Sequence, residues 1–175
     1  MRFPYKRVLI VGCGGAGKST LARAMGERFG LPVVHLDRIW WKAGWVHITR
    51  EEFDRQLAVE LAKPLWIIDG DYSRTFEARL QRADFCILLD LDTNICLKSA
   101  YARAEMYAGR SRPDMADGCE ERVDEEFEQW ILRFKQEVLP RMLSALEKSG
   151  VEHRIFTTRE EAHAWMNGFE ASESN

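Results

Sequence analysis

The chain has 175 residues, a formal net charge of −3 and a sequence pI of about 5.9. This length suits one domain over residues 1–175 with its own hydrophobic core. The acidic balance argues against direct nucleic-acid binding, which usually depends on an excess of lysine and arginine. No apolar stretch approaches the roughly 18 residues of a membrane span, and Met1–Arg7 lacks the apolar core of a signal peptide. We therefore expect a cytoplasmic protein with no membrane partner.

The first predicted element is a buried strand, Val8–Val11, and it leads directly into a glycine-rich motif. Residues 12–19 read Gly-Cys-Gly-Gly-Ala-Gly-Lys-Ser, which fits the P-loop pattern G-x-x-x-x-G-K-[ST] between a strand and a helix. Glycines let the backbone curl so that several N–H groups surround a phosphate, and the next helix adds its positive end. The alternative is a glycine-rich turn with no ligand.

The motif assigns a role to each of its polar side chains. Lys18 can reach the β and γ phosphates of a nucleotide, and the Ser19 hydroxyl can bind Mg²⁺. We therefore expect ATP as phosphoryl donor and Mg²⁺ as cofactor. The predicted nucleotide-binding residues are Gly12, Cys13, Gly14, Gly15, Ala16, Gly17, Lys18, Ser19 and Thr20.

After the P-loop, short apolar runs alternate with helical patterns. A helix is predicted over Lys18–Phe29, and further strands over Val33–Leu36, Trp66–Ile68, Phe85–Leu89 and His153–Phe156. Strands separated by helices predict parallel βαβ units, so the fold class is α/β. Capping boxes at Thr49–Glu52 and Thr158–Glu161 predict two helix starts. A helix over 93–108 and a longer one over 120–147, kinked or divided at Pro140, complete the pattern.

An aspartate follows or ends three of the predicted strands. Asp37 closes the second strand, Asp69 the third and Asp90 the fourth. Because ligands of open α/β sheets bind beyond the carboxyl ends of the strands, these carboxylates could orient Mg²⁺, through water, or a substrate hydroxyl. The alternative for each is a helix N-cap or a loop acid.

Two segments are candidates for binding a second substrate. Asp69 begins a turn that includes Arg74, whose guanidinium could hold an anionic group, although it could equally be a solvated side chain. Three tryptophans lie within residues 40–45, in a predicted acceptor segment over about 37–62. Their rings could stack on a base or a sugar, or could simply pack a subdomain core. The predicted acceptor residues are Asp37, Trp41, Asp69 and Arg74.

A polar segment over about 109–118, rich in helix breakers, joins two predicted helices. Arg110 and Arg112 lie on it and Arg103 precedes it. Arginines on a closing loop neutralise the charge of a transferring phosphoryl group and exclude water, so this segment is predicted to be a lid. The alternative is a solvated connector. The predicted catalytic residues are Lys18, Asp37, Arg103, Arg110 and Arg112.

The pieces, in this order, resemble the adenylate-kinase-like branch of small P-loop kinases. Asp69–Thr75 is similar to the Asp-Gly-Phe-Pro-Arg-Thr stretch of adenylate kinases, with one residue inserted and the proline lost. In those kinases the aspartate organises Mg²⁺ and the arginine binds the acceptor phosphate. Asp37 resembles the strand-end aspartate with which shikimate kinases hold acceptor hydroxyls. The resemblance implies a three-layer P-loop NTPase fold, with a five-stranded parallel sheet in the order 2-3-1-4-5 and helices on both faces.

A closer resemblance is to the bacterial family labelled "DNA topology modulation protein". It covers about residues 6–168, and its matching stretches are His35–Asp37, Trp41–Trp45, Ile67–Thr75 and Arg110–Met115. The label implies a DNA-related role, whereas the motifs are those of a small-molecule kinase.

Two functions follow from these observations. The first is a phosphotransferase that moves the γ-phosphoryl group of ATP-Mg to a small acceptor such as a nucleoside or nucleotide, with Asp37 orienting or deprotonating a hydroxyl. Ser19 and Asp69 would bind the metal. The alternative is a nucleotide-dependent regulator related to DNA topology modulation, without a small-molecule acceptor. A signalling GTPase is disfavoured because the chain lacks an Asn-Lys-x-Asp stretch.

Overall fold

A computed structural model describes residues 1–172 and contains one five-stranded parallel sheet. The strands lie in the order β2-β5-β1-β6-β7, which in chain order of the sheet strands is 2-3-1-4-5, as the resemblance implied. Their bounds are β1 Arg7–Gly12, β2 Val33–His35, β5 Trp66–Asp69, β6 Phe85–Leu89 and β7 His153–Phe156. The predicted α/β fold class is confirmed.

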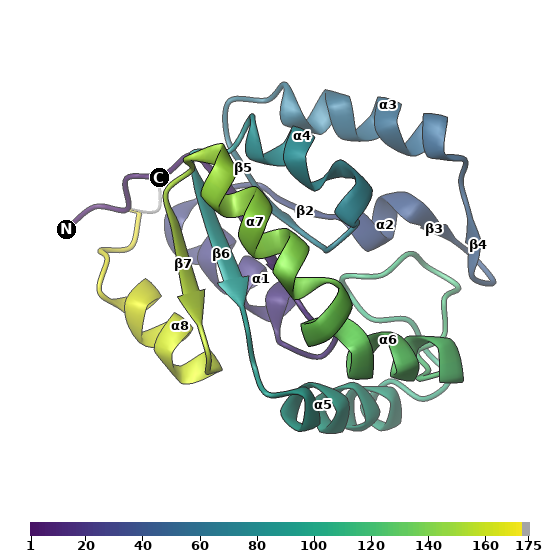
Figure 1. The fold of residues 1–175 in the computed structure, drawn as a ribbon. Helices are drawn as coiled ribbons and strands as arrows, with labels where there is room; N and C mark the ends of the chain where they lie inside the picture. Colours follow the sequence, from purple (N-terminus) through teal and green to yellow (C-terminus); the bar gives the residue numbers. More distant parts are fainter. Residues whose placement is uncertain (173–175) are drawn as a thin grey trace.

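Helices cover both faces of the sheet, with α1 behind it and α7 in front of it in Figure 1. The central strands are buried on both faces, which explains their continuous apolar runs. The helices are α1 Lys18–Phe29, α3 Arg50–Leu61, α4 Phe76–Leu80, α5 Thr93–Met106, α6 Glu125–Glu137, α7 Leu139–Ser149 and α8 Arg159–Asn167.

Small elements that the sequence did not predict lie at the carboxyl ends of β2 and β5. They are the short helix α2 (Leu36–Trp40), the hairpin strands β3 (Trp41–Lys42) and β4 (Val46–His47), and a 3-10 turn, η1 (Ser73–Thr75). The prediction that Asp37 closes the second strand was wrong. The last pair of the β2–β5 ladder joins His35 to Asp69, where β5 ends, so the chain turns into α2 and places Asp37 in its first turn.

Helix boundaries follow the capping side chains. The helix predicted from about residue 120 begins at Glu125 because the Asp124 carboxylate accepts a hydrogen bond from the Phe127 N–H. The chain breaks at Val138, two residues before Pro140, which therefore lies in the first turn of α7, where proline is tolerated. The capping box at Thr158 is complete. At Thr49 only the hydroxyl half forms, since the Glu52 carboxylate binds Arg55 and Gln56 instead.

The two ends of the described chain lie together. The amino group of Met1 pairs with the Glu170 carboxylate at 2.9 Å, and the Ser172 N–H donates to the Arg28 carbonyl at 2.8 Å. Within residues 1–172, none of the helices has the length and apolar character needed to cross a bilayer.

Candidate active site

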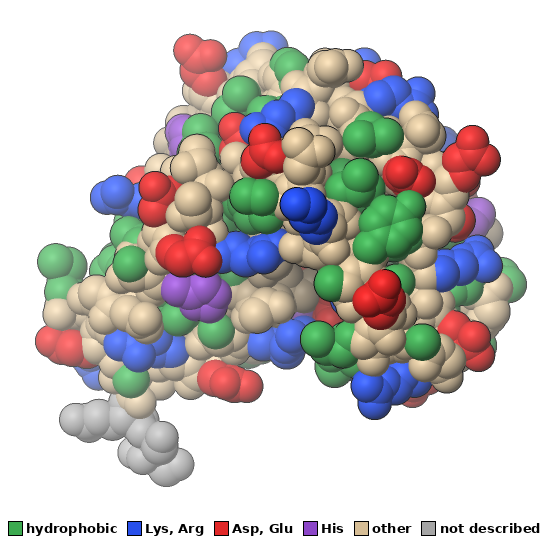
Figure 2. Space-filling view, turned by 90° about the horizontal axis from the view of Figure 1, so that it is seen from below, with side chains coloured by type: hydrophobic (Ala, Val, Ile, Leu, Met, Phe, Trp, Pro, Cys, Tyr) green, Lys and Arg blue, Asp and Glu red, His purple; other side chains and the backbone are tan. Residues whose placement is uncertain are grey.

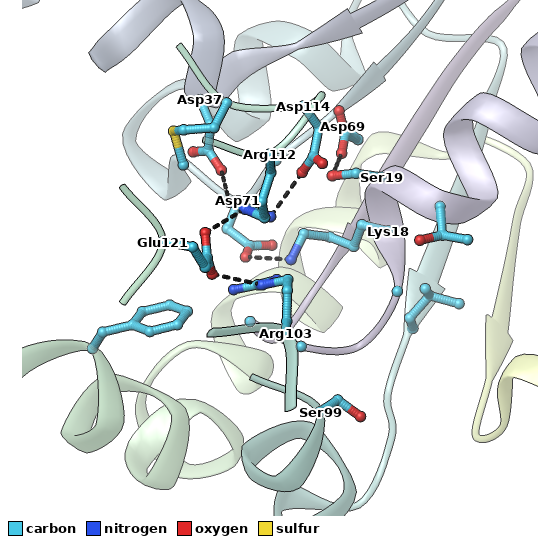
Figure 3. A pocket seen from close by; sticks show the side chains of 18 of the residues that line it. Lys18, Ser19, Asp37, Asp69, Asp71, Ser99, Arg103, Arg112, Asp114 and Glu121 are labelled. Carbon is cyan, nitrogen blue, oxygen red and sulfur yellow. Dashed lines mark hydrogen bonds and ion pairs between the residues drawn. The ribbon is translucent and has the colours of Figure 1, made fainter. Parts of the chain in front are cut away.

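A cavity of about 1100 Å³ opens at the carboxyl ends of β1, β5 and β2. Its walls come from the P-loop, the end of β5, α2 with the following hairpin, α5, the segment from Arg112 to Phe127 and the start of α8 (Figure 3). Of the predicted nucleotide-binding residues, those that line it are Gly14, Gly15, Gly17, Lys18, Ser19 and Thr20. The cavity is where the topology of an open α/β sheet places a ligand.

Lys18 lies folded over its own loop. Its ammonium group donates to the carbonyl oxygens of Gly12 at 2.6 Å and Cys13 at 2.9 Å, and lies 3.2 Å from a carboxylate oxygen of Asp71. Burial by itself would lower the pKa of Lys18, but the charge and hydrogen bond of Asp71 together with its other neighbours outweigh burial, and the pKa is raised. Lys18 is therefore positively charged at the mouth of the P-loop.

Arg159, at the start of α8, fixes the curl of the P-loop and was missed by the sequence analysis. Its guanidinium donates to the carbonyl oxygens of Gly15 at 2.6 Å and Ala16 at 3.1 Å, and to the Ser99 hydroxyl at 2.7 Å. Gly15 has a φ of 78°, and an added Cβ there would lie 2.1 Å from the carbonyl oxygen of Cys96. The loop therefore requires glycine at this position.

Asp69 ends β5 as predicted and binds two neighbours. The Ser19 hydroxyl donates to one carboxylate oxygen, and the His35 Nδ1 lies 2.6 Å from the other. The Asp69 side chain is buried, so these contacts fix its orientation. Hydroxyl and carboxylate oxygens are the donors that Mg²⁺ prefers, and nucleotide-bound Mg²⁺ takes its other ligands from phosphate and water. Ser19 and Asp69 thus fit the predicted metal role.

The turn after β5 adds Asp71, to which the sequence analysis gave no role. Its carboxylate accepts from the Gly12 N–H at 2.9 Å besides pairing with Lys18. Arg79 of α4, with no exposed surface, donates to the carbonyl oxygens of Gly70, Asp71 and Tyr72 and so fixes the turn. Burial lowers the pKa of Arg79 to about 10, so it stays charged at neutral pH.

Asp37 faces the cavity from α2 with 39% of its side-chain surface exposed. The Tyr72 hydroxyl donates to one carboxylate oxygen at 2.7 Å, and the Arg112 guanidinium lies 3.9 Å from the other. Tyr72 reaches it from a backbone with a φ of 28°, a strained value for a tyrosine that the Arg79 contacts support. The pKa of Asp37 is raised, because desolvation outweighs the opposing effects of Tyr72 and Arg112.

The segment after α5 contains a buried ion-pair network (Figure 3). Arg112 lies 2.8 Å from Asp114 and 2.5 Å from Glu121, and Arg103 donates to Glu121 at 2.7 Å. Arg23 of α1 also pairs with Asp114 at 3.2 Å. Burial would raise the pKa of Asp114, but Arg112 and its other neighbours lower it overall. These ion pairs join the segment predicted to be a lid to α1 and α5 at the edge of the cavity.

Of the residues predicted for catalysis and acceptor binding, Arg110 and Arg74 do not line the cavity. Arg110 donates to the Met106 carbonyl at 2.7 Å and lies over the Tyr107 ring. Arg74 forms a two-pronged ion pair with Asp54, with nitrogen–oxygen distances of 3.0 and 2.6 Å, and nearly half of each side chain is exposed.

The tryptophan-rich residues 40–45 run from the end of α2 into the β3–β4 hairpin. Trp40, Trp41 and Trp45 all line the cavity. The hairpin docks on the lid: the Gly44 N–H donates to the Gly118 carbonyl at 2.8 Å, and the Trp45 indole donates to the Glu120 carbonyl at 3.0 Å. The acceptor segment and the lid thus form one wall.

The side chains of Asp90, at a strand end, and Cys13, in the P-loop, do not line the cavity. Asp90, after β6, pairs with Lys135 of α6 at 3.0 Å and does not line the cavity. The thiol of Cys13 is buried toward α6, near the Ile131 carbonyl, so this residue can offer a nucleotide only its backbone.

A search of protein-family models finds no match for this sequence, and a search of curated proteins likewise finds none. Among solved structures, shikimate kinase from Acinetobacter baumannii in complex with shikimate has a TM-score of 0.62 at 16% identity, covering 93% of this chain and 89% of that one. A sugar kinase from Janibacter sp. has a TM-score of 0.56 at 16% identity, covering 94% and 92%.

Shikimate kinase from Bacteroides thetaiotaomicron is also similar, with a TM-score of 0.53 at 18% identity over 94% of this chain and 96% of that one. At these identities the similarity concerns the fold. The chain shares the α/β fold of these kinases, a five-stranded parallel sheet flanked by helices.

Proposed function

We propose that this protein is a phosphotransferase that moves the γ-phosphoryl group of ATP to a hydroxyl of a small acceptor. One observation supports this most directly. A single cavity joins a P-loop with a charged lysine, Lys18, to a partly exposed carboxylate, Asp37, on the opposite wall. A donor phosphate and an acceptor hydroxyl can therefore meet in one cavity, as direct transfer between them requires.

On the donor side, the P-loop amides and Lys18 hold the phosphates. Ser19 and Asp69 would hold Mg²⁺, which would offset the negative charge that develops during transfer. Arg103 and Arg112 line the same cavity. To contact the transferring group they must exchange Glu121 for a phosphate oxygen.

On the acceptor side, Asp37 orients the attacking hydroxyl. The hydroxyl oxygen forms a bond to the γ phosphorus while the bond from that phosphorus to the bridging oxygen of ADP breaks. The hydroxyl proton passes to the Asp37 carboxylate. The pKa of Asp37 is raised, so its carboxylate is a better proton acceptor at neutral pH than that of an ordinary aspartate. Arg74 can contribute only after leaving Asp54, so we assign it no part in this step.

The test is acceptor-dependent ADP release by the purified protein with ATP and Mg²⁺, measured across nucleosides, sugars and nucleotides. We expect at least one compound to raise the rate well above the acceptor-free rate, and the Asp37→Asn variant to lose that stimulation while still binding nucleotide. No stimulation by any compound would contradict the proposal. A salt-dependent shift of duplex DNA by the same protein would instead support the DNA-related alternative.

A further inference from the structure

Three arginines that line the cavity, Arg23, Arg103 and Arg112, are each already paired with a carboxylate of the protein. Arg112, only 8% exposed at its side chain, lies between Asp114 and Glu121. Arg103 shares Glu121 with it, and Arg23 pairs with Asp114. Because each guanidinium has a carboxylate partner within 3.2 Å, an anionic acceptor would have to displace a protein carboxylate to gain a charged contact.

The charges of this group balance. The three guanidinium groups of Arg23, Arg103 and Arg112 face three carboxylates, on Asp37, Asp114 and Glu121. An added carboxylate or phosphate would leave a net negative charge in a partly desolvated space. If Arg103 or Arg112 turns to the donor phosphates, the excess of negative charge facing the acceptor grows. Both states disfavour an anion there.

Asp37 is the acceptor-side carboxylate that remains open to a ligand. Its side chain is 39% exposed, against 7% for Asp114 and 2% for Glu121. Its second oxygen has Arg112 only at the long distance of 3.9 Å. An open carboxylate accepts hydrogen bonds from hydroxyl groups, and it repels a second negative charge.

The remaining wall beside Asp37 is aromatic, with Arg122, itself paired with Asp124 at 3.5 Å, lying over the Trp45 ring. Trp41 and Trp45 lie edge to face with ring centroids 5.3 Å apart, and both line the cavity with Met115. Trp45 is fixed by its bond to the Glu120 carbonyl. Indole rings take the apolar face of a sugar or a base, while a carboxylate close by binds that molecule's hydroxyls.

We propose that the acceptor is an uncharged cyclic polyol, a sugar or a nucleoside, and that the Arg23–Asp114–Arg112–Glu121–Arg103 network excludes carboxylate- and phosphate-bearing acceptors. This rests on the proposed phosphotransferase activity. Asp114 and Glu121 are the specificity-determining residues, because they cancel the charge that an anionic acceptor would need.

The first experiment measures kcat/KM for ADP release with matched pairs that differ in one charge: thymidine against thymidine 5′-monophosphate, and glucose against glucuronate. We expect the neutral member of at least one pair to exceed its anionic partner by about tenfold or more. Which pair responds distinguishes a nucleoside from a sugar. A smaller ratio in every responding pair, or a preference for the anion, overturns the acceptor class but leaves the kinase activity standing.

Failure of the proposed function looks different. If no nucleoside, sugar or nucleotide of the wider panel stimulates ADP release while a nonhydrolysable ATP analogue still binds with Mg²⁺, the phosphotransferase proposal fails, and the acceptor class with it.

The second experiment changes the network itself. In Asp114→Asn, Arg23 and Arg112 lose a shared carboxylate, so we expect the neutral-to-anionic ratio of kcat/KM to fall by roughly tenfold. Glu121→Gln is the second variant, should Asp114→Asn fail to fold. Glu60→Gln, which breaks an exposed helical ion pair with Lys63, is the matched control and should leave the ratio unchanged. An unchanged ratio in a folded network variant overturns the assignment.

Discussion

The side chain of Glu121 shows how much one buried acid can organise. It is 2% exposed and lies within 2.7 Å of both Arg103 and Arg112, which enter from α5 and from the lid. Removing its charge would leave two desolvated guanidiniums with one fewer partner, a change that costs several kcal/mol in buried networks. The same contacts hold these arginines until a phosphate competes for them.

Lys18→Ala tests the donor side. We expect kcat to fall by roughly 100-fold or more, because a positive charge aimed at the transferring group is lost. Lys63→Ala, which removes a half-exposed lysine just after α3, is the control. Steady-state ADP release measures both, and thermal melting verifies that each variant is folded. A Lys18→Ala enzyme with normal kcat would exclude the proposed donor site.

The pH dependence of the reaction tests Asp37. In the proposed mechanism the ionised form of Asp37 is active, so kcat/KM should decline as the pH falls through the Asp37 pKa. An ordinary aspartate has a pKa of about 4. Because the pKa of Asp37 is raised, the decline should occur at a higher pH than that. The Tyr72 hydroxyl bond opposes this rise. Tyr72→Phe should therefore move the acid limb to still higher pH, and Asp37→Asn should remove it. A limb that stays in place in both variants would assign it to another group.

At the scale of elements, the hairpin β3–β4 and the lid behave as one wall. They are joined by a main-chain hydrogen bond from Gly44 to Gly118, by the Trp45 indole and by the Cys119 thiol, which donates to the Lys42 carbonyl at 3.1 Å. Arg38 of α2 adds a bond to the Pro113 carbonyl. The hairpin and α2 are therefore tied to the segment that carries Arg112. Figure 2 shows the molecule from below the view of Figure 1, and acidic and basic side chains are interspersed on this face.

Gly118→Ala tests this docking. A Cβ there would lie 2.7 Å from the Ala43 Cβ, so the hairpin must move away. We expect the acceptor KM to rise by about tenfold through lost positioning, with binding of an ATP analogue unchanged. Gly109→Ala is the matched control, since it has a similar φ, 73° against 78°, with no atom within 4 Å of the added Cβ. Equal effects of the two substitutions would show that backbone strain, rather than docking, is responsible.

At the scale of the whole molecule, the sheet order brings distant segments to one edge. β1 pairs with β5 and β6, and β5 with β2, so the P-loop and the Asp69 turn open on the same side, beside α2. Arg159 then closes the site from the far end of the chain, through its contacts with Gly15 and Ser99. The proposed nucleotide site is therefore built from elements at both ends of the sequence.

Nucleotide binding should therefore stabilise the whole fold. At a concentration of about 100 times the dissociation constant, a ligand that binds only the folded state adds ~2.7 kcal/mol. For a chain of this size that raises Tm by about 5–10 °C. Differential scanning fluorimetry with an ATP analogue and Mg²⁺ measures this, and Lys18→Ala should reduce the shift. A Tm that does not respond to the nucleotide in the intact protein would argue against the donor site.

The amino-acid sequence determined the local features of this protein by itself. The P-loop depends on contiguous residues, and continuous apolar runs such as Phe85–Leu89 identify strands buried on both faces. Capping side chains and Gly30 mark the helix ends. These features were predictable because each rests on interactions between residues close in the chain.

Only the tertiary structure decided which charges are available to a ligand. The sequence does not show that Arg112 pairs with Glu121. Nor does it show that Asp71 pairs with Lys18, which lies 53 residues earlier in the chain. The Arg74 side chain, expected at the acceptor, pairs with Asp54 of α3 instead. An ion pair depends on the positions of two side chains after folding, and its strength depends on how far both are removed from water, so residue type and spacing could not fix the charge balance of the cavity.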